Sequence, residues 1–140
     1  MKRILLFFLL TYFISSCQKA TENPPINKEN ISGVWLLTGK RMSATGVPEQ
    51  DAFATMDECE KDNLYYFDVN NSLRYLDSGV TCEMNEPYLG SWELRDEVIE
   101  FMGQAGNITK FDGSYMEITV GIADATSEIV FTIKYTFKRI

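Results

Sequence analysis

Alternation of apolar and polar residues runs along most of the chain after Gly33 and predicts β-strands. The clearest case is the last run, in which apolar side chains stand at every second position from Ile129 to Phe137, mostly separated by threonine and lysine. Residues two apart share a face of a strand, so we expect this run to bury one face and expose the other. No segment after Gly33 combines the length and the 3.6-residue period of a substantial helix.

Short runs of this kind recur with brief breaks, as in an antiparallel meander. The predicted strands are Val34–Arg41, Leu64–Val69, Leu73–Asp77, Leu89–Arg95, Val98–Met102, Asn107–Asp112, Tyr115–Gly121 and Glu128–Arg139. Asn70-Asn71 and Asp112-Gly113 are typical of hairpin turns. The predicted fold is all-β, an eight-stranded antiparallel up-and-down barrel, because closure removes unpaired strand edges. A two-sheet β-sandwich is the alternative. Residues 42–63 are predicted to be a long loop with a single helical turn at Asp51–Met56.

The same alternation predicts which side chains point inward. Besides Ile129, Phe131, Ile133, Tyr135, Phe137 and Arg139 of the last run, they are Trp35, Leu37, Tyr65, Phe67, Leu73, Tyr75, Trp92, Leu94, Ile99, Phe101, Met116, Ile118 and Val120. Both tryptophans follow a glycine by two residues, in Gly33-Val34-Trp35 and Gly90-Ser91-Trp92. A glycine beside each indole on the inner face is expected to let the curved sheet close over it.

The first residues have the features of a targeting segment rather than of a fold. Lys2 and Arg3 precede an apolar run, Ile4–Ile14, that is shorter than the ~20 residues of a membrane span. The sequence Ile14-Ser15-Ser16-Cys17 resembles the lipobox of bacterial lipoproteins, which implies cleavage of residues 1–16 and acylation of Cys17. Gln18 follows that cysteine, where aspartate would signal retention at the inner membrane. We therefore expect a lipoprotein of the Gram-negative outer membrane, with the leaflet left open.

Residues 17–30 carry Pro24-Pro25 without apolar periodicity and are predicted to be a flexible tether. Residues 31–140 are then one folded domain. Loss of Lys2 and Arg3 would change the formal charge from -7 to -9. Such an acidic chain repels phosphates, so nucleic acid is not an expected partner.

Besides Cys17, the chain has two cysteines, Cys59 and Cys82. An even pair in an exported protein predicts one disulfide, the alternative being two free thiols. That disulfide would attach the end of the long loop to the Ser78–Pro87 connection.

The order of motifs is similar to that of the lipocalin-like domain of bacterial envelope lipoproteins. The motifs are Gly33-x-Trp35, Asp57-Glu58-Cys59-Glu60-Lys61-Asp62 before Leu64-Tyr65-Tyr66-Phe67, Cys82, Gly90-Ser91-Trp92-Glu93-Leu94 and Tyr135-Thr136-Phe137-Lys138-Arg139. The resemblance covers residues 31–140 and implies a lipocalin-type barrel. It also implies that Arg139 lies across Trp35 and closes the floor of the barrel. Gly33, Gly90 and Trp92 are predicted to take part in closing the barrel because each glycine lies beside an indole on the inner face. The chain is shorter than classical lipocalins and has no substantial C-terminal helix.

The sequence gives little reason to expect catalysis or metal binding. Histidine is absent, which removes the commonest general base and metal ligand, so we expect neither an enzyme nor a cofactor. The acidic run Asp57–Asp62 lacks the glycine and terminal glutamate of an EF-hand loop, so no metal is predicted there.

The inward aromatic residues carry the functional hypothesis. An eight-stranded barrel either packs solid or holds one small molecule. In the second case the ligand would be hydrophobic or amphipathic and would bind at the rim, beneath the long loop. The predicted lining residues are Tyr65, Phe67, Tyr75, Trp92, Phe101, Phe131 and Tyr135. In the first case the chain is an interaction module, an accessory lipoprotein with an envelope protein as partner.

Overall fold

The computed structural model describes residues 22–82, 88–123 and 128–140. The predicted signal peptide, residues 1–16, and Cys17, the predicted site of acylation, lie outside these residues. The elements are α1 (Lys28–Ile31), β1 (Gly33–Ala44), β2 (Val47–Asp51), α2 (Glu58–Lys61), β3 (Leu64–Phe67), β4 (Ser72–Leu76), β5 (Tyr88–Arg95), β6 (Val98–Phe101), β7 (Gln104–Phe111), β8 (Tyr115–Ala123) and β9 (Val130–Arg139). No helix among the described residues is long and apolar enough to cross a membrane.

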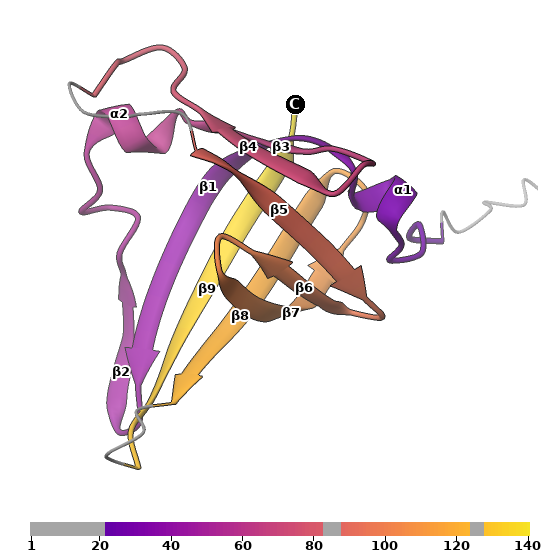
Figure 1. Cartoon of the computed structure of the whole chain (residues 1–140). Helices are drawn as coiled ribbons and strands as arrows, with labels where there is room; N and C mark the ends of the chain where they lie inside the picture. The colour runs from indigo at the N-terminus through magenta and orange to yellow at the C-terminus, as the bar shows by residue number, and fades with distance from the viewer. Residues whose placement is uncertain (1–21, 83–87, 124–127) are drawn as a thin grey trace, which may run out of the picture.

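The strands form one antiparallel sheet that closes on itself (Figure 1). Each of β3 to β9 pairs with its neighbour in sequence, and β9 returns to pair with β1 from Trp35↔Arg139 to Ala44↔Phe131. Strands β1 and β3–β9 therefore make a closed eight-stranded up-and-down barrel, with β2 as one additional strand. The predicted barrel is confirmed, and the sandwich alternative is wrong.

The segment 42–63 is more ordered than the predicted loop. β1 continues to Ala44 and forms a hairpin with β2, in which Arg41 lies opposite Asp51. The helical turn is not at Asp51–Met56 but at Glu58–Lys61. Residues of β2 are exposed on both faces and include Pro48, so they lack the alternation that would have predicted a strand.

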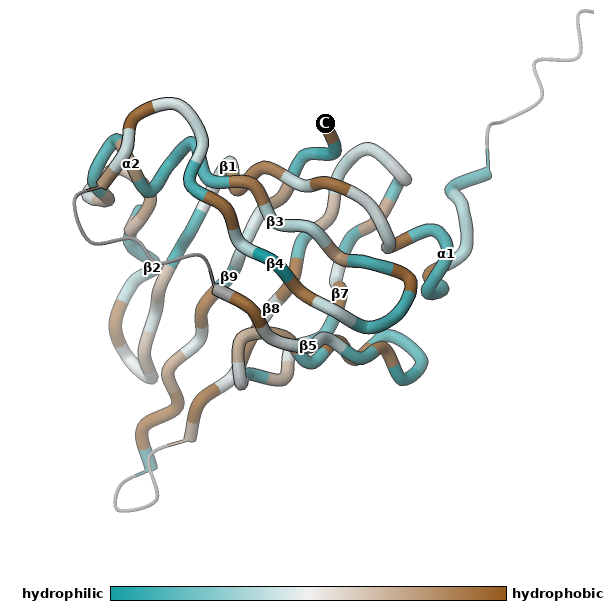
Figure 2. Tube along the Cα trace, turned by 45° about the horizontal axis from the view of Figure 1, so that its top comes forward, coloured by the Kyte–Doolittle hydropathy of each residue, from teal (hydrophilic) through white to brown (hydrophobic). Residues whose placement is uncertain are grey.

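Strands of unequal length give the barrel a long extension. At ~3.3 Å per residue, the ten residues of β9 span about 33 Å and the four of β3 about 13 Å. The outer halves of β1, β8 and β9, together with β2, therefore project beyond the closed barrel (Figure 1). Hydrophobic positions recur along β8 and β9 into this extension (Figure 2).

The predicted tether does not extend to residue 30. Lys28–Ile31 form α1, whose N-cap Asn27 accepts a hydrogen bond from the backbone N–H of Asn30. Ile31 is fully buried, and Ile26 packs against the core. Burial of these apolar side chains stabilises the segment on the barrel, so the folded domain begins before residue 31.

The predicted inward residues form most of the core. Fully or nearly buried are Trp35, Leu37, Tyr65, Phe67, Leu73, Trp92, Ile99, Phe101, Met116, Ile118, Val120, Ile133 and Phe137. Tyr75, Leu94 and Tyr135 are partly buried and pack against this core. Ile108 and Phe111 of β7 also belong to it, whereas Ile129 and Phe131 are 41% and 43% exposed.

Candidate functional site

The closed end of the barrel is built around Arg139. Its guanidinium lies 4.4 Å from the ring centroid of Trp35, which is the arrangement that the resemblance implies. Nε donates to the carbonyl of Gly113 at 2.7 Å and Nη1 to that of Ser32 at 2.9 Å, while Nη2 donates to the carbonyl of Asn30. The side chain thus joins the ends of β1, β8 and β9 to α1. We interpret this end as structural.

Gly33 makes room for Arg139 rather than for the indole of Trp35. A Cβ built on Gly33 would overlap Nη1 of Arg139, and the backbone φ is +147°. An L-residue is strained at this φ whatever the space around it. Gly90 does not lie beside Arg139; its cross-strand neighbour is the buried Leu73 of β4.

Both indoles are satisfied within the fold. Nε1 of Trp35 donates to the carbonyl of Ile31, and Nε1 of Trp92 donates to that of Asp68, each at 2.8 Å. Trp35 is 0% and Trp92 1% exposed. Neither N–H is therefore left for a ligand to bind.

Aromatic rings fill the inner half of the barrel. The centroid of Phe67 lies 5.4 Å from Trp92, 6.3 Å from Phe101 and 6.4 Å from Phe137, mostly in edge-to-face contacts. Such contacts add to the free energy of burial. This part of the interior is packed solid, so Phe67 and Trp92, predicted to line a ligand, are core residues.

A half-enclosed hollow of about 230 Å³ remains at the mouth of the barrel. We call it the mouth pocket. Its lining residues are Leu37, Lys40, Met56, Glu60, Tyr65, Tyr75, Phe101, Met102, Gln104 and Tyr135. Four of the seven predicted lining residues are among them: Tyr65, Tyr75, Phe101 and Tyr135. The interior is thus filled near α1 and open at the opposite end.

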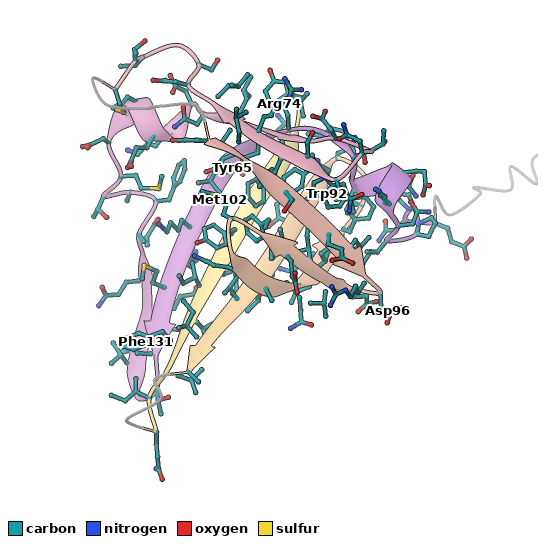
Figure 3. All side chains as sticks on the ribbon, viewed as in Figure 1. Tyr65, Arg74, Trp92, Asp96, Met102 and Phe131 are labelled. Carbon is teal, nitrogen blue, oxygen red and sulfur yellow. A yellow bond between two sulfur atoms is a disulfide. The ribbon has the colours of Figure 1, made fainter. Side chains whose placement is uncertain are left out.

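Phe131 does not line the mouth pocket. It pairs with Ala44 and Ile122 near the tip of the extension, far from Tyr65 and Met102 (Figure 3). The prediction was wrong because alternation fixes the face of a strand and not the height of a residue along it. β9 is longer than the barrel is deep, so Phe131 has left the closed part.

The three tyrosines supply polar groups to the pocket wall. The Tyr75 hydroxyl accepts a hydrogen bond from Nδ2 of Asn63 at 2.5 Å, and the Tyr135 hydroxyl donates to Oε1 of Gln104 at 3.4 Å. Burial, followed by electrostatic interactions with Tyr75, Tyr135 and Glu60, raises the pKa of Tyr65. Burial also raises the pKa of Tyr135, against the hydrogen bond with Gln104. Both phenols are therefore neutral donors at neutral pH.

The outer wall of the pocket is fixed by the disulfide. Met56 and Glu60 line the pocket from the segment that contains α2. Cys59 is bonded to Cys82 with a Cα–Cα distance of 5.4 Å, which confirms the predicted pairing. Oδ2 of Asp62 accepts from the N–H of Val80 at 2.8 Å, so the same two segments are joined a second time.

The other six lining residues were not predicted to line a ligand: Leu37, Lys40, Met56, Glu60, Met102 and Gln104. Strict alternation from Trp35 places Lys40 outside, but the register shifts between Leu37 and Gly39, so that Lys40 lies opposite Tyr135. Gly39 was the available signal, because a glycine within a strand often marks a bulge. The position of Glu60 depends on the long-range disulfide and has no local signal.

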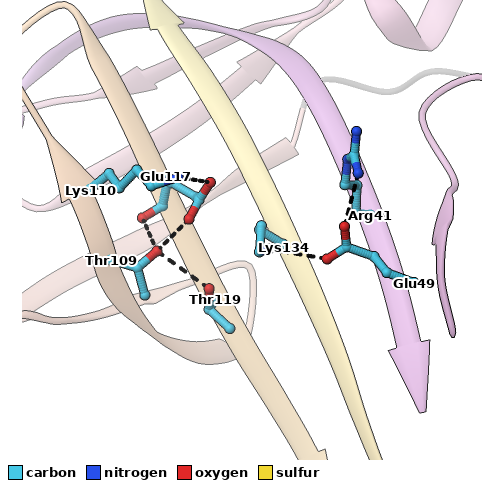
Figure 4. Close-up of polar contacts among 7 residues, drawn as sticks. All are labelled: Arg41, Glu49, Thr109, Lys110, Glu117, Thr119 and Lys134. Carbon is cyan, nitrogen blue, oxygen red and sulfur yellow. Dashed lines mark hydrogen bonds and ion pairs between the residues drawn. The ribbon is translucent and has the colours of Figure 1, made fainter. Parts of the chain in front are cut away.

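Two larger hollows lie on the outside and are more open to solvent. One, of about 440 Å³, runs over Trp92 and Gln104; the other, of about 380 Å³, lies along β1, β8 and β9. Ion pairs cross the second: Glu49 contacts Arg41 at 2.9 Å and Lys134 at 3.1 Å (Figure 4). Lys40 lines this hollow as well as the mouth pocket. We favour the mouth pocket as the binding site because four aromatic rings line it.

Comparisons of the chain with protein-family models, with curated proteins and with solved structures give no match. Within the described ranges, no group of three histidine, cysteine, aspartate or glutamate side chains is arranged to bind a metal ion.

Proposed function

We propose that this chain is a membrane-anchored binding protein that holds a small amphipathic molecule in the mouth pocket. The observation that supports this most is a hollow of about 230 Å³, lined by four aromatic rings, at the open end of an otherwise filled barrel.

The size of the hollow limits the ligand. Pockets for drug-sized ligands measure ~300–1,000 Å³, so this one suits a smaller molecule, or one end of a larger molecule that projects into solvent. The packed rings of Phe67, Trp92 and Phe137 lie below it, so a long chain has no room deeper in the barrel.

The lining indicates an amphipathic ligand. Leu37, Phe101 and Met102 offer apolar contact area, and the phenols of Tyr65 and Tyr135 offer hydroxyl groups. An apolar wall with a few placed polar groups is the usual composition of a small-molecule site.

The test is titration of the purified protein with an environment-sensitive apolar dye, together with native mass spectrometry. We expect saturable dye binding that is blocked in Met102→Trp, because the larger ring would occupy the pocket. Met42→Trp is the matched control: both methionines are 38% exposed, but Met42 does not line the pocket. Unsaturable dye uptake, or equal binding by both variants, would contradict the proposal.

The proposed address is the outer membrane of a Gram-negative bacterium, reached through acylated Cys17. It rests on the lipobox-like sequence Ile14-Ser15-Ser16-Cys17 and on Gln18. Several acyl chains, each contributing ~0.8 kcal/mol per buried CH₂ group, give effectively permanent attachment.

A second candidate function is the docking of an envelope protein on the extension. Met42, Ile122 and Phe131 lie on its inner face and are 38–43% exposed. Exposed apolar patches often mark interaction sites. Photo-crosslinking from position 131 in the native envelope should then recover one defined partner, and an absence of crosslinked product would contradict this function.

A further inference from the structure

Two opposite charges line the mouth pocket without an ion-pair partner. Lys40 and Glu60 both contribute to its wall, and neither forms an ion pair with any described residue. The residues that follow them in the sequence do form ion pairs: Arg41 contacts Glu49 at 2.9 Å, and Lys61 contacts Glu58 at 2.7 Å. Lys40 and Glu60 are the two charged residues in the lining of the mouth pocket, and no described residue neutralises either of them in an ion pair.

The two charges come from different elements. Lys40 belongs to β1, and its Nζ lies 6.0 Å from the ring centroid of Tyr135. Glu60 belongs to α2, and its charge acts on the phenol of Tyr65. The pocket therefore has a positive and a negative group in its wall, each beside a tyrosine.

Aromatic surface adjoins both charges. Tyr65 and Tyr75 have ring centroids 5.2 Å apart, and Phe101 and Tyr135 have theirs 5.6 Å apart. The Tyr65 hydroxyl forms no hydrogen bond with a described residue, although only 8% of this residue is exposed. A carboxylate would accept from Tyr65 and Lys40, and an ammonium group is attracted by both a carboxylate and the faces of tyrosine rings.

We propose that the ligand of the mouth pocket is a small zwitterion with an apolar side chain, the class of free aromatic and large aliphatic amino acids. This inference rests on the proposed function. The ligand carboxylate binds Lys40 and the Tyr65 hydroxyl, the ammonium group binds Glu60 and the tyrosine faces, and the apolar group contacts Leu37, Phe101 and Met102.

The test is competition against the apolar dye by four compounds with the same ring. The probes are L-phenylalanine, 3-phenylpropanoate, phenethylamine and 3-phenyl-1-propanol, which carry both charges, the negative one, the positive one and neither. We expect L-phenylalanine to displace the dye at about tenfold lower concentration than any of the other three. Equal or better displacement by a singly charged or neutral compound would overturn the proposal, as would no displacement.

Variants assign each charge. Lys40→Met should remove the advantage of L-phenylalanine over phenethylamine, and Glu60→Gln its advantage over 3-phenylpropanoate. Glu58→Gln is the matched control, since Glu58 lies on the same helix but does not line the pocket. The assignment is overturned if the control changes the order of the compounds as much as Glu60→Gln does.

The two proposals fail separately. If the dye binds the pocket and Met102→Trp blocks it, but the four compounds compete alike, the zwitterion assignment fails and the binding function stands. If the dye does not bind the pocket, both fail.

Discussion

The charge of Arg139 is held by main-chain carbonyl groups, not by a carboxylate. Its side chain donates hydrogen bonds to the carbonyl groups of Asn30, Ser32 and Gly113, and burial lowers the pKa of the guanidinium. Arginine remains protonated in proteins, so these carbonyls and the face of Trp35 stabilise a half-buried cation.

Gly33→Ala should therefore be unusually destabilising. The new Cβ would displace the guanidinium from its carbonyls, and the φ of +147° is strained for alanine. We expect a loss of about 3 kcal/mol in the free energy of unfolding, measured by urea denaturation.

Gly46→Ala is the control, since Gly46 has a φ of +77° but nothing within 4 Å of its added Cβ. It should lose about 1 kcal/mol. Equal losses would show that Arg139 does not contribute.

Glu117 makes stability depend on pH. It is 7% exposed, yet its carboxylate accepts from Thr109 at 2.9 Å and from Lys110 at 3.2 Å (Figure 4). Burial raises its pKa, but these hydrogen bonds and the charges of Lys110 and Lys134 lower it more, so the pKa lies below its ordinary 4.5. A lowered carboxyl pKa stabilises the fold above the unfolded value, and this contribution is lost as the pH falls through the folded value.

Glu117→Gln should therefore lower the free energy of unfolding by about 1 kcal/mol at pH 7 and have a smaller effect below pH 4. Urea denaturation across this pH range measures it. Glu100→Gln, at an exposed position on β6, should leave both values unchanged. A deficit that is the same at low and at neutral pH would contradict the role of the ionised carboxylate.

At the scale of elements, α2 is too short to be stable alone and depends on its covalent link. It has four residues, and the Cys59–Cys82 disulfide spans 23 positions. In the chain-entropy model a loop of this length contributes about 3 kcal/mol.

Reduction should thus lower the free energy of unfolding by about 3 kcal/mol, measured by urea denaturation with and without reductant. Reduction should also weaken dye binding, because α2 carries Glu60 of the pocket wall. The Cys59→Ser/Cys82→Ser variant should resemble the reduced protein and should not respond to reductant. A wild type that is equally stable in both states would contradict a structural role of the bond.

The elements also show what the sequence could predict. The barrel strands bury one face and expose the other, so alternation located them and most of their inward side chains. β2 has five exposed residues and exists because the outer part of β1 needs a hydrogen-bonding partner. Lys40 was not predicted to face inward because a bulge shifts the register of β1 before it. Phe131 was placed in the pocket because alternation does not tell how far along β9 a residue lies. In each case the missing information is a pairing with a distant strand, which no local pattern carries.

At the scale of the whole molecule, the two ends of the barrel have different tasks. α1, Trp35 and Arg139 close the end where the described chain enters the fold, and the mouth pocket lies above the packed core. The extension projects away from α1 (Figure 1). A lipid anchor upstream of α1 would therefore attach the closed end to the membrane and leave the mouth accessible.

This arrangement separates attachment from binding. Once residues 1–16 are removed, Cys17→Ala should move from the detergent phase to the aqueous phase in a Triton X-114 partition of whole cells, because the proposed acyl chains would attach to that cysteine. The dye affinity of the purified variant should equal that of the wild type, since no residue before Leu37 lines the mouth pocket and the pocket lies at the opposite end of the barrel from α1.

Ser16→Ala is the control, because a small residue is kept before the cysteine and partitioning should not change. A Cys17→Ala protein that lacks residues 1–16 and still stays in the detergent phase would contradict acylation at this position. A variant that partitions into water but loses dye binding would instead show that the anchor and the pocket are coupled, contrary to the separation of the two ends.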